Sequence, residues 1–456
     1  MSIQPPGPNG IPLFGNSRQY ANDPFGFMEA CADAYGDVVR FDLGPMPIYM
    51  LTNPRDIERV LADEHASYRK PDLDDAMDEL LGEGLLLSEG ETWRRQRTLA
   101  NPAFRADRLG GLDGMILECV TELLDGWSPG DRIDIHSEMA RVTVRIIVNA
   151  MFGIDIDEDR VRTVQENLEP LGARFEPDPM RVLVPGWVPT RENVAFATAL
   201  ETIESIVAEL IESRRRRGDY HGREDDRPMD LLSILLRAMD EGEQTATNLR
   251  DEMVTMLLAG HDTTALTLTY TWYLLSEHPD VRDRLHGELD DVLGGELPRA
   301  DDLRALEYTG WVLNEAMRLY PPVYTIFREP AVDVQLGGYR IPAGAGLMLP
   351  QWVVHRSPRW YDDPDTFDPE RWAPDRRADR PRFSFFPFGG GPRHCIGKQL
   401  SLLEATLIIG TVAQTYDLAY LGDGGFGLRG SLTMHPDQPV AMRIRSRDTD
   451  TVGTQS

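Results

Sequence analysis

The spacing of apolar and polar positions along the chain predicts a protein that is mostly helical. Alternation typical of strands is confined to two short runs near the N-terminus, VVRFDL and PIYMLT. Residues 176–192, which are rich in proline, and the charged residues 214–228 interrupt the helical series. The expected helices cover about residues 23–36, 53–64, 91–126, 136–152, 158–172, 192–217 and 248–277, with short helices in a loop at 71–90. The pattern predicts a mainly α fold with a small β region.

The longest helical pattern, residues 248–277, has an unusual centre that reads AGHDTT. Gly260 in a helix interior costs about 1 kcal/mol relative to alanine. Thr263 and Thr264 carry hydroxyls that compete for backbone carbonyls, and Asp262 places an acid beside them in an apolar stretch. Such a helix often bends and leaves room for a ligand or water. An acid beside a hydroxyl can pass protons to a bound molecule; a buried aspartate with only local bonds is the alternative.

A glycine-rich segment, FPFGGGPRHCIG at residues 386–397, carries Cys395, one of three cysteines in the chain. A disulfide does not require such a loop, and a zinc site would need a CxxC spacing around it. The remaining interpretation is a single thiolate that a tight loop presents to a bulky cofactor. Glycines let the backbone approach closely, and loop N–H groups can stabilise a negative sulfur. Cys31 and Cys119 lie in helical patterns and are expected to be ordinary thiols.

Charge is the most unusual feature of the composition. Asp and Glu number 75 against 47 Lys and Arg, a net charge of −28, and the only lysines are Lys70 and Lys398. An acidic surface disfavours nucleic acids and anionic membranes. Abundant carboxylates with arginine in place of lysine favour a halophilic protein, because salt screens self-repulsion; a solvated acidic surface is the simpler alternative. Few cysteines, no signal peptide and no long apolar run predict a cytoplasmic protein without a membrane span.

Five motifs, taken in order along the chain, resemble those of the cytochrome P450 family. FGGGPRHCIG, in which Phe388 precedes Cys395 by seven residues, resembles the haem-binding loop. AGHDTT is similar to the oxygen-activating motif of the long central helix. WRRQR, from Trp93 to Arg97, matches the pattern of a haem-contacting helix. EAMR and PERW resemble two segments that meet in a buried network in this family.

The resemblance implies one haem-thiolate monooxygenase domain over residues 1–446, with a disordered C-terminal tail at 447–456. The fold is expected to be mainly α and triangular, with haem between the long central helix and the helix after Cys395. A structural network is expected from Glu315, Arg318 and Arg371. Three histidines that could be mistaken for metal ligands or catalytic groups are expected to pack or to form hydrogen bonds: His261, His355 and His394.

The resemblance also implies roles for single residues around haem b. Cys395 would be the proximal thiolate ligand, which donates electron density to iron and favours O–O cleavage. Thr263 would hydrogen-bond dioxygen, and Asp262 would help to deliver protons. Trp93, Arg97, Arg328 and Arg393 are expected to hold the haem propionates. Further cofactor contacts are expected from the cysteine loop, at Phe388, Gly389 and Gly397, and from the central helix, at Ala259.

We therefore expect a monooxygenase that inserts one atom of O2 into an apolar substrate of the fatty acid, isoprenoid or carotenoid class. Segments 71–88, 168–190, 257–264, 323–327 and 432–434 are expected to line its pocket. The named lining residues are Leu85, Leu86, Val323, Ile326, Leu432 and Met434. A haem-binding sensor or electron carrier without oxygen chemistry is the alternative. The acid–hydroxyl pair favours the enzyme, because a carrier has no use for it.

Electrons are expected from a separate partner of the ferredoxin or flavodoxin type, with its reductase. The chain contains no flavin or nicotinamide fingerprint, and it ends about 60 residues after Cys395. Docking is expected on the proximal face, where basic residues stand out on an acidic molecule. Those residues are Arg94, Arg95, Arg393 and Lys398.

Overall fold

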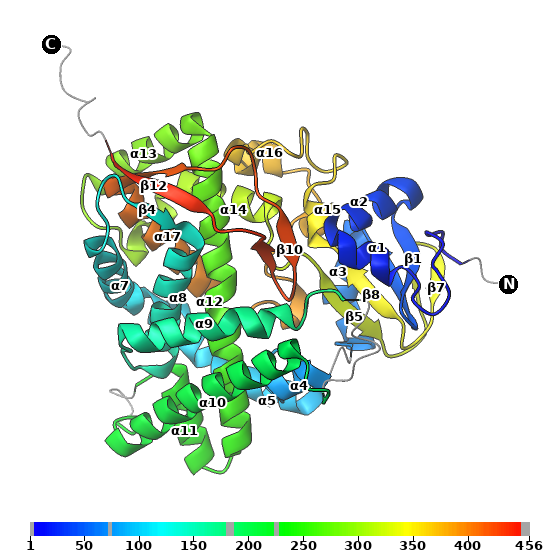
Figure 1. The fold of residues 1–456 in the computed structure, drawn as a ribbon, viewed down its shortest axis with the longest axis horizontal. Coiled ribbons are helices and arrows are strands. Elements are labelled where there is room, and N and C mark those ends of the chain that lie inside the picture. The colour runs from blue at the N-terminus through cyan, green and yellow to red at the C-terminus, as the bar shows by residue number, and fades with distance from the viewer. Residues whose placement is uncertain (1–3, 72–74, 179–186, 223–227, 448–456) are drawn as a thin grey trace.

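A computed structural model describes residues 4–71, 75–178, 187–222 and 228–447. One long helix, α12, crosses the molecule; β1, β5, β7 and β8 lie to one side of it with α1, α2 and α15, and α7, α8 and α13 lie to the other side with β4 and β12 (Figure 1). The helices are α1 (Ser17–Asn22), α2 (Pro24–Tyr35), α3 (Pro54–Glu58), α4 (Asp75–Leu81), α5 (Gly90–Ala100), α6 (Ala106–Leu109), α7 (Asp113–Asp125), α8 (Ile135–Phe152), α9 (Glu158–Ala173), α10 (Arg191–Arg217), α11 (Leu231–Asp240), α12 (Ala246–Glu277), α13 (Pro279–Leu293), α14 (Glu307–Leu319), α15 (Gln351–His355), α16 (Pro374–Arg377) and α17 (Lys398–Thr415).

The largest sheet has the strand order β1-β2-β8-β5-β3. Its strands are β1 (Val38–Leu43), β2 (Met46–Leu51), β3 (Tyr68–Arg69), β5 (Ile326–Pro330) and β8 (Gly346–Leu349). The β1–β2 hairpin is antiparallel and β8 runs parallel to β2, so residues far apart in the chain complete a sheet begun near the N-terminus. The smaller sheets join β4 (Arg132–Asp134) with β12 (Ala441–Ser446) and β9 (Tyr416–Tyr420), β6 (Val334–Leu336) with β7 (Tyr339–Ile341), and β10 (Leu428–Gly430) with β11 (Met434–Pro436).

The predicted mainly α fold with a small β region is confirmed, and most predicted helices are present. The predicted helix 91–126 is wrong as one element. It divides into α5, the short α6 and α7, with single 3-10 turns between them, because Pro102 cannot continue a helix and Gly110 and Gly111 weaken the next stretch. The predicted C-terminal tail lies outside the described residues apart from Arg447, whose N–H donates to Thr415 O at 3.1 Å.

The central helix α12 begins at a threonine cap, where the Thr245 side chain accepts a hydrogen bond from the N–H of Asn248. It continues unbroken through Gly260. A Cβ at Gly260 would lie 2.6 Å from the Ile147 side chain of α8, so the glycine allows these two helices to pack closely.

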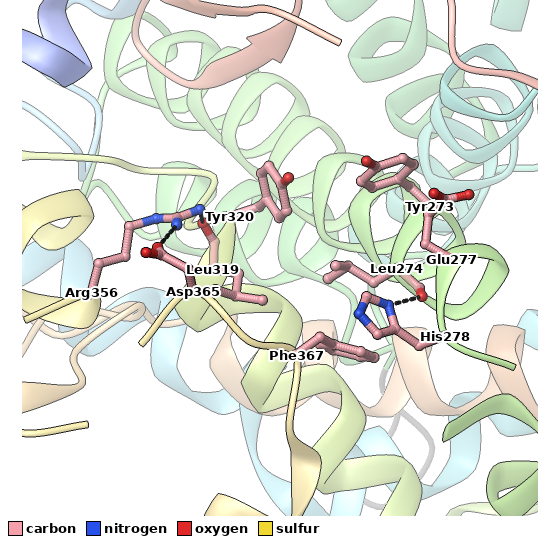
Figure 2. A pocket seen from close by; sticks show the side chains of 9 residues that line it. All are labelled: Tyr273, Leu274, Glu277, His278, Leu319, Tyr320, Arg356, Asp365 and Phe367. Carbon is pink, nitrogen blue, oxygen red and sulfur yellow. Dashed lines mark hydrogen bonds and ion pairs between the residues drawn. The ribbon is translucent and has the colours of Figure 1, made fainter. Parts of the chain in front are cut away.

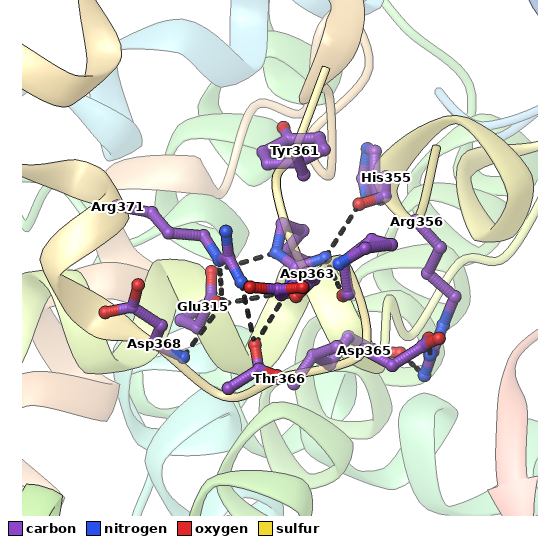
Figure 3. A network of polar contacts seen from close by, with 12 residues as sticks. Glu315, His355, Arg356, Tyr361, Asp363, Asp365, Thr366, Asp368 and Arg371 are labelled. Carbon is purple, nitrogen blue, oxygen red and sulfur yellow. Dashed lines mark hydrogen bonds and ion pairs between the residues drawn. The ribbon is translucent and has the colours of Figure 1, made fainter. Parts of the chain in front are cut away.

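A buried network ties α14 to the segment before the cysteine loop (Figure 3). Both side chains of the EAMR pair, Glu315 and Arg318, are fully buried, and Arg318 donates to Glu315 at 2.8 and 2.9 Å. Arg371 donates to Glu315 at 3.0 Å, and the Trp372 indole donates to it at 3.1 Å. Arg318 also donates to the carbonyl of His355 at 3.0 Å. The predicted network is therefore present, and its charges are paired, as buried charges must be.

Candidate active site

The cysteine loop is shaped by glycines in positions where a side chain would not fit. Gly391 has a φ of 64°, and a Cβ there would lie 1.9 Å from the carbonyl oxygen of Leu61. Gly389 also has a positive φ, 67°. The N–H of Cys395 donates to the carbonyl of Phe388 at 2.9 Å, which closes the loop. These contacts hold Cys395 directly before α17.

Cys395 is an exposed residue, whereas Cys31 and Cys119 are buried. The surrounding protein desolvates its thiol and raises its pKa, but four groups act in the opposite direction and favour the thiolate. They are the backbone N–H groups of Gly397 and Lys398, at the start of α17, and the charges of Arg97 and Lys398. The loop thus offers hydrogen bonds and positive charge to a negative sulfur. By contrast, burial raises the pKa of Cys31 to about 11 and that of Cys119 to about 12, which makes both unreactive.

The middle of α12 carries an accessible stripe in a helix that is otherwise largely buried. Ala259 is exposed and Thr263, one turn later, is partly exposed. The Thr263 hydroxyl donates to the Ala259 carbonyl at 3.2 Å. Thr264 reaches the other way and lies 3.0 Å, Oγ to Oγ, from Ser401 of α17. The stripe and the cysteine loop therefore lie on elements that contact each other.

Three buried or half-buried cations gather beside the loop. Lys70 donates to the carbonyls of Leu85 at 3.1 Å and Ser88 at 3.3 Å, and Arg393 donates to the Ser88 carbonyl at 3.1 Å. Arg393 also pairs with Glu89. Burial and the charge of Arg393 lower the pKa of Lys70 to about 7 and that of Arg328 to about 10.

The cluster of Lys70, Arg328 and Arg393 thus carries more positive charge than Glu89 neutralises. Two further carboxylates placed there would relieve the repulsion between the cations. Among the residues that the structure describes, Arg328 donates only to the carbonyl of Phe327, at 2.7 Å, so its other N–H groups are available to a ligand. Lys70 was missed as a site residue. One hint of its role was visible in the sequence, since Lys70 is one of only two lysines in the chain. Its cationic neighbours became visible only in the structure.

The remaining predicted contact residues surround the same loop. The Arg393 guanidinium lies 4.4 Å from the ring centre of Trp93, which holds both side chains in place. Arg97 donates to the carbonyl of His394 at 3.0 Å, beside Cys395. A Cβ at Gly397 would lie 3.9 Å from the Cys395 sulfur, and the Phe388 ring lies 5.5 Å from the Lys398 ammonium. All eleven predicted site residues thus belong either to the cysteine loop and its neighbours or to the centre of α12.

The histidines of this region form hydrogen bonds, as predicted. The His355 Nε2 accepts from the N–H of Phe386 at 3.0 Å and fixes the start of the cysteine loop. Its burial, together with the charge of Arg318, lowers its pKa to about 3, so the ring stays neutral. Nδ1 of His394 lies 2.9 Å from the carbonyl oxygen of Gly391. Nδ1 of the buried His261 lies 2.7 Å from the carbonyl oxygen of Leu257.

Asp262 does not stand alone on α12. Its carboxylate accepts a hydrogen bond from the Thr433 hydroxyl at 2.6 Å, and its Oδ2 lies 3.6 Å from Nε2 of His435. Both partners belong to the β10–β11 hairpin, about 170 residues later in the chain. Sequence reasoning did not identify these partners, because no local spacing connects them to Asp262.

A surface pocket of about 360 Å³ lies near the C-terminal end of α12 (Figure 2). Tyr273 on its wall follows Thr263 by ten residues, about 15 Å along the helix. Two of its lining residues, Arg356 and Asp365, form an ion pair at 2.8 Å. None of the eleven predicted site residues lines it. The pocket is formed by Tyr273, Leu274, Glu277, His278, Leu319, Tyr320, Arg356, Asp365 and Phe367.

These groups fit a haem. The thiol of the exposed Cys395, before a helix start, could bind the iron, the surplus cations suit two propionates, and the stripe of Ala259 and Thr263 leaves part of one helix face accessible. Haem bound in this way would lie between the cysteine loop and α12.

Comparison with known proteins agrees with this geometry. The family profile of cytochrome P450 matches residues 5–429. A cyclooctat-9-en-7-ol 5-monooxygenase of Streptomyces melanosporofaciens is 34% identical over 420 residues, covering 90% of this chain and 88% of the relative. A pentalenene oxygenase of Streptomyces avermitilis is 30% identical over 447 residues, covering 96% and 97%. The crystal structure of a cytochrome P450DA haem domain superposes with a TM-score of 0.86 at 26% identity and covers 98% of each chain.

The fold and the site define a haem-thiolate enzyme, and the chain belongs to the cytochrome P450 family. It is a monooxygenase of that family, which acts on apolar substrates with haem b as cofactor. The predicted family, fold class, activity and cofactor are confirmed. In the described part of the chain, no helix is long and apolar enough to span a membrane.

Proposed function

We propose that this monooxygenase oxidises a cyclic isoprenoid alkene or alcohol in a single domain of residues 1–446. Two relatives are named for the oxidation of cyclooctat-9-en-7-ol and of pentalenene. Four of the apolar residues expected at the pocket keep accessible side chains, namely Leu86, Val323, Ile326 and Leu432. The other two, Leu85 and Met434, are buried in the core instead, and Met434 packs in a cluster with Tyr270 and Tyr324.

The observation that carries the catalytic proposal is the Asp262–Thr263 pair on the accessible face of α12. Bound haem supplies oxygen activation through its thiolate-ligated iron. Cys395 would hold the iron, and Lys70, Trp93, Arg97, Arg328 and Arg393 would hold the propionates. Thr263 offers a hydroxyl that both donates and accepts hydrogen bonds. Asp262 holds and releases the protons that the reaction consumes.

Isoprenoid alkenes and alcohols are expected to bind more tightly than fatty acids of equal carbon number. The β1–β2 hairpin offers Tyr49 and Met50 but no cation that could anchor a carboxylate in its second strand. Titration of the haem enzyme with matched pairs, followed by the shift of the Soret band, measures the dissociation constants. Tighter binding of the fatty acid in each pair would contradict the proposed substrate class.

The redox partner is proposed to be an acidic ferredoxin or flavodoxin that docks beside the cysteine loop. Arg95 and Lys398 are exposed there, and Arg94 is exposed but pairs with Glu91. Arg393, which was also expected to contribute, is turned inward onto Glu89 and is less suited to docking. Positive charge on this face of an acidic molecule would steer an anionic partner.

Reversal of both exposed charges, Arg95→Glu with Lys398→Glu, is expected to slow electron transfer from such a partner about 10-fold at low salt. The difference should shrink in molar salt, where the Debye length falls to about 3 Å. Stopped-flow reduction with a ferredoxin and with a flavodoxin measures the rate. Arg340→Glu, on the β6–β7 hairpin, is the matched control. Equal rates in all three proteins would rule out this docking face.

We also propose that the enzyme works in a salt-rich cytoplasm, because a net charge of −28 opposes the compact state. The Debye length falls from about 30 Å at 0.01 M salt to about 3 Å at 1 M. Haem retention and melting temperature should therefore rise along a potassium chloride series from 0.1 M to molar salt. The Soret band measures haem retention, and circular dichroism measures the melting temperature. A flat response would show that the acidic surface serves solubility alone.

A further inference from the structure

A threonine hydroxyl bridges the Asp262 carboxylate to an imidazole. Thr433, directly before β11, donates to Oδ2 of Asp262 at 2.6 Å, and its hydroxyl oxygen lies 2.8 Å from Nε2 of His435. The direct separation of Nε2 and Oδ2 is 3.6 Å, which is too long for a hydrogen bond. A hydroxyl can accept one hydrogen bond while it donates another. The three side chains therefore form a continuous chain of two hydrogen bonds.

Asp262 is ionised at neutral pH. Burial alone would raise the pKa of its carboxyl, but the charge of His435 and the hydrogen bond from Thr433 outweigh burial and hold that pKa well below the usual range. A carboxylate in this state releases a proton only after it has received one. Within the described ranges of the chain, the side chains in polar contact with it are those of Thr433 and His435.

His435 can exchange protons with solvent. Its side chain is 24% exposed. Burial lowers the pKa of its imidazole, but the nearby negative charge of Asp262 outweighs this, so the pKa is raised. An unperturbed imidazole titrates near pH 6.5, so a modest rise makes it a proton carrier at neutral pH.

The other charged groups around His435 leave it as the proton carrier of this cluster. Arg429 of β10 opposes its protonation, and Glu176, after α9, favours it. The His136 ring of α8 packs edge-on at 5.6 Å between centroids. Burial lowers the pKa of His136 and of His261, and the charge of His435 lowers both further, so both rings stay neutral.

The hairpin that carries these groups is fixed to the rest of the molecule. The Tyr270 hydroxyl of α12 donates to the carbonyl of Met434 at 2.6 Å, and the N–H of Met434 donates to the carbonyl of Pro322 at 2.8 Å. Ser431 donates to the Gly172 carbonyl at 2.7 Å. The distances within the bridge are therefore set by contacts on both sides of it.

We propose that His435 and Thr433 form the proton entry of this enzyme, in which His435 takes protons from solvent and Thr433 passes them to Asp262. The proposal rests on the proposed role of Asp262 in proton delivery. His435 and Thr433 act through Asp262 and are positioning and relay residues.

The transfer step balances within the three side chains. The N–H bond at Nε2 of the imidazolium breaks and an O–H bond forms at Oγ of Thr433, while the original hydroxyl proton of Thr433 moves to Oδ2 of Asp262. The imidazole becomes neutral and Asp262 becomes a carboxylic acid. After Asp262 has given up its proton to the reaction, the neutral imidazole takes another from a solvent acid.

The test compares four variants of the haem enzyme: Thr433→Val, Thr433→Ser, His435→Gln and Asp262→Asn. Valine keeps the shape of threonine without its hydroxyl, whereas serine keeps the hydroxyl. Glutamine keeps hydrogen-bonding groups but cannot carry the proton. The measured quantities are the rate of product formation, the share of electrons lost as hydrogen peroxide, and the pKa of His435 from nuclear magnetic resonance of labelled histidine.

Thr433→Val and His435→Gln should form product about 10-fold more slowly, with more peroxide, while Thr433→Ser stays close to the unaltered enzyme. Product formation by the unaltered enzyme should decline as pH rises through the pKa of His435, and this decline should vanish in His435→Gln. The pKa of His435 should fall in Asp262→Asn, which tests the contact without reference to activity.

Loss of coupling in Asp262→Asn but in neither Thr433→Val nor His435→Gln would overturn the relay and leave the role of Asp262 intact. Unchanged coupling in all of these variants would overturn the proposed role of Asp262 and the relay together. Equal effects of Thr433→Val and Thr433→Ser would also overturn the relay, because the hydroxyl would then be irrelevant.

Discussion

Cys395→Ser should abolish monooxygenase activity and the red-shifted Soret band that carbon monoxide gives with reduced, thiolate-ligated haem. The N–H groups of Gly397 and Lys398 and the charge of Arg97 favour a negative atom at this position. A serine hydroxyl does not ionise there, so the electron donation that favours O–O cleavage is lost. This is the largest single-residue effect expected, because every later step depends on the ligand.

The spectrum of the reduced carbon monoxide complex measures this effect. Cys119→Ala is the matched control, since Cys119 is a buried free thiol in α7 and should leave the band unchanged. A normal band in Cys395→Ser would place the axial ligand elsewhere. Loss of the band in both variants would indicate general damage to the fold and not removal of a ligand.

Thr263→Ala should bind haem and substrate normally but lower the rate of product formation by about 10²–10⁴-fold, the usual contribution of acid–base assistance. Thr263 is partly exposed on the accessible stripe, so its hydroxyl can face a bound molecule while it also bonds to the Ala259 carbonyl. Without it, protons from Asp262 reach the reaction poorly, and electrons should leave as hydrogen peroxide.

The ratio of product to reductant consumed measures this loss. Thr271→Ala is the matched control, because Thr271 lies two turns further along α12, is buried, and bonds to the Thr267 carbonyl at 2.7 Å. Thr263→Ser, which keeps the hydroxyl, should restore most of the coupling. Unchanged coupling in Thr263→Ala would remove Thr263 from the mechanism.

Local features of the sequence determined the fold class and the centre of the site. The spacing of apolar positions predicted α12 to within a few residues, since a long helix is specified by its own periodicity. The cysteine loop was predictable because its glycines are required by backbone angles that few other residues adopt, as at Gly391. Glu315 and Arg318 lie three residues apart on one helix, so their pairing was also visible in the sequence.

Tertiary structure decided the features that depend on contacts between distant segments. The cluster of Lys70, Arg328 and Arg393 joins three parts of the chain; burial lowers the pKa of each cation, and the charge of Arg393 lowers those of Lys70 and Arg328 further. The inward turn of Arg393 onto Glu89 likewise withdrew it from the surface. No local spacing encodes such charge clusters, because they arise only when separate elements pack.

The partners of Asp262 are the clearest case. A proton-delivering acid was predictable from AGHDTT, but its contacts with Thr433 and His435 cross about 170 residues of chain and exist only because the β10–β11 hairpin packs on α12. The same holds for Gly260, whose role is set by Ile147 of α8. The sequence by itself thus determined which chemical groups the site contains. Packing decided which group touches which, because distances and local dielectric are properties of the folded chain.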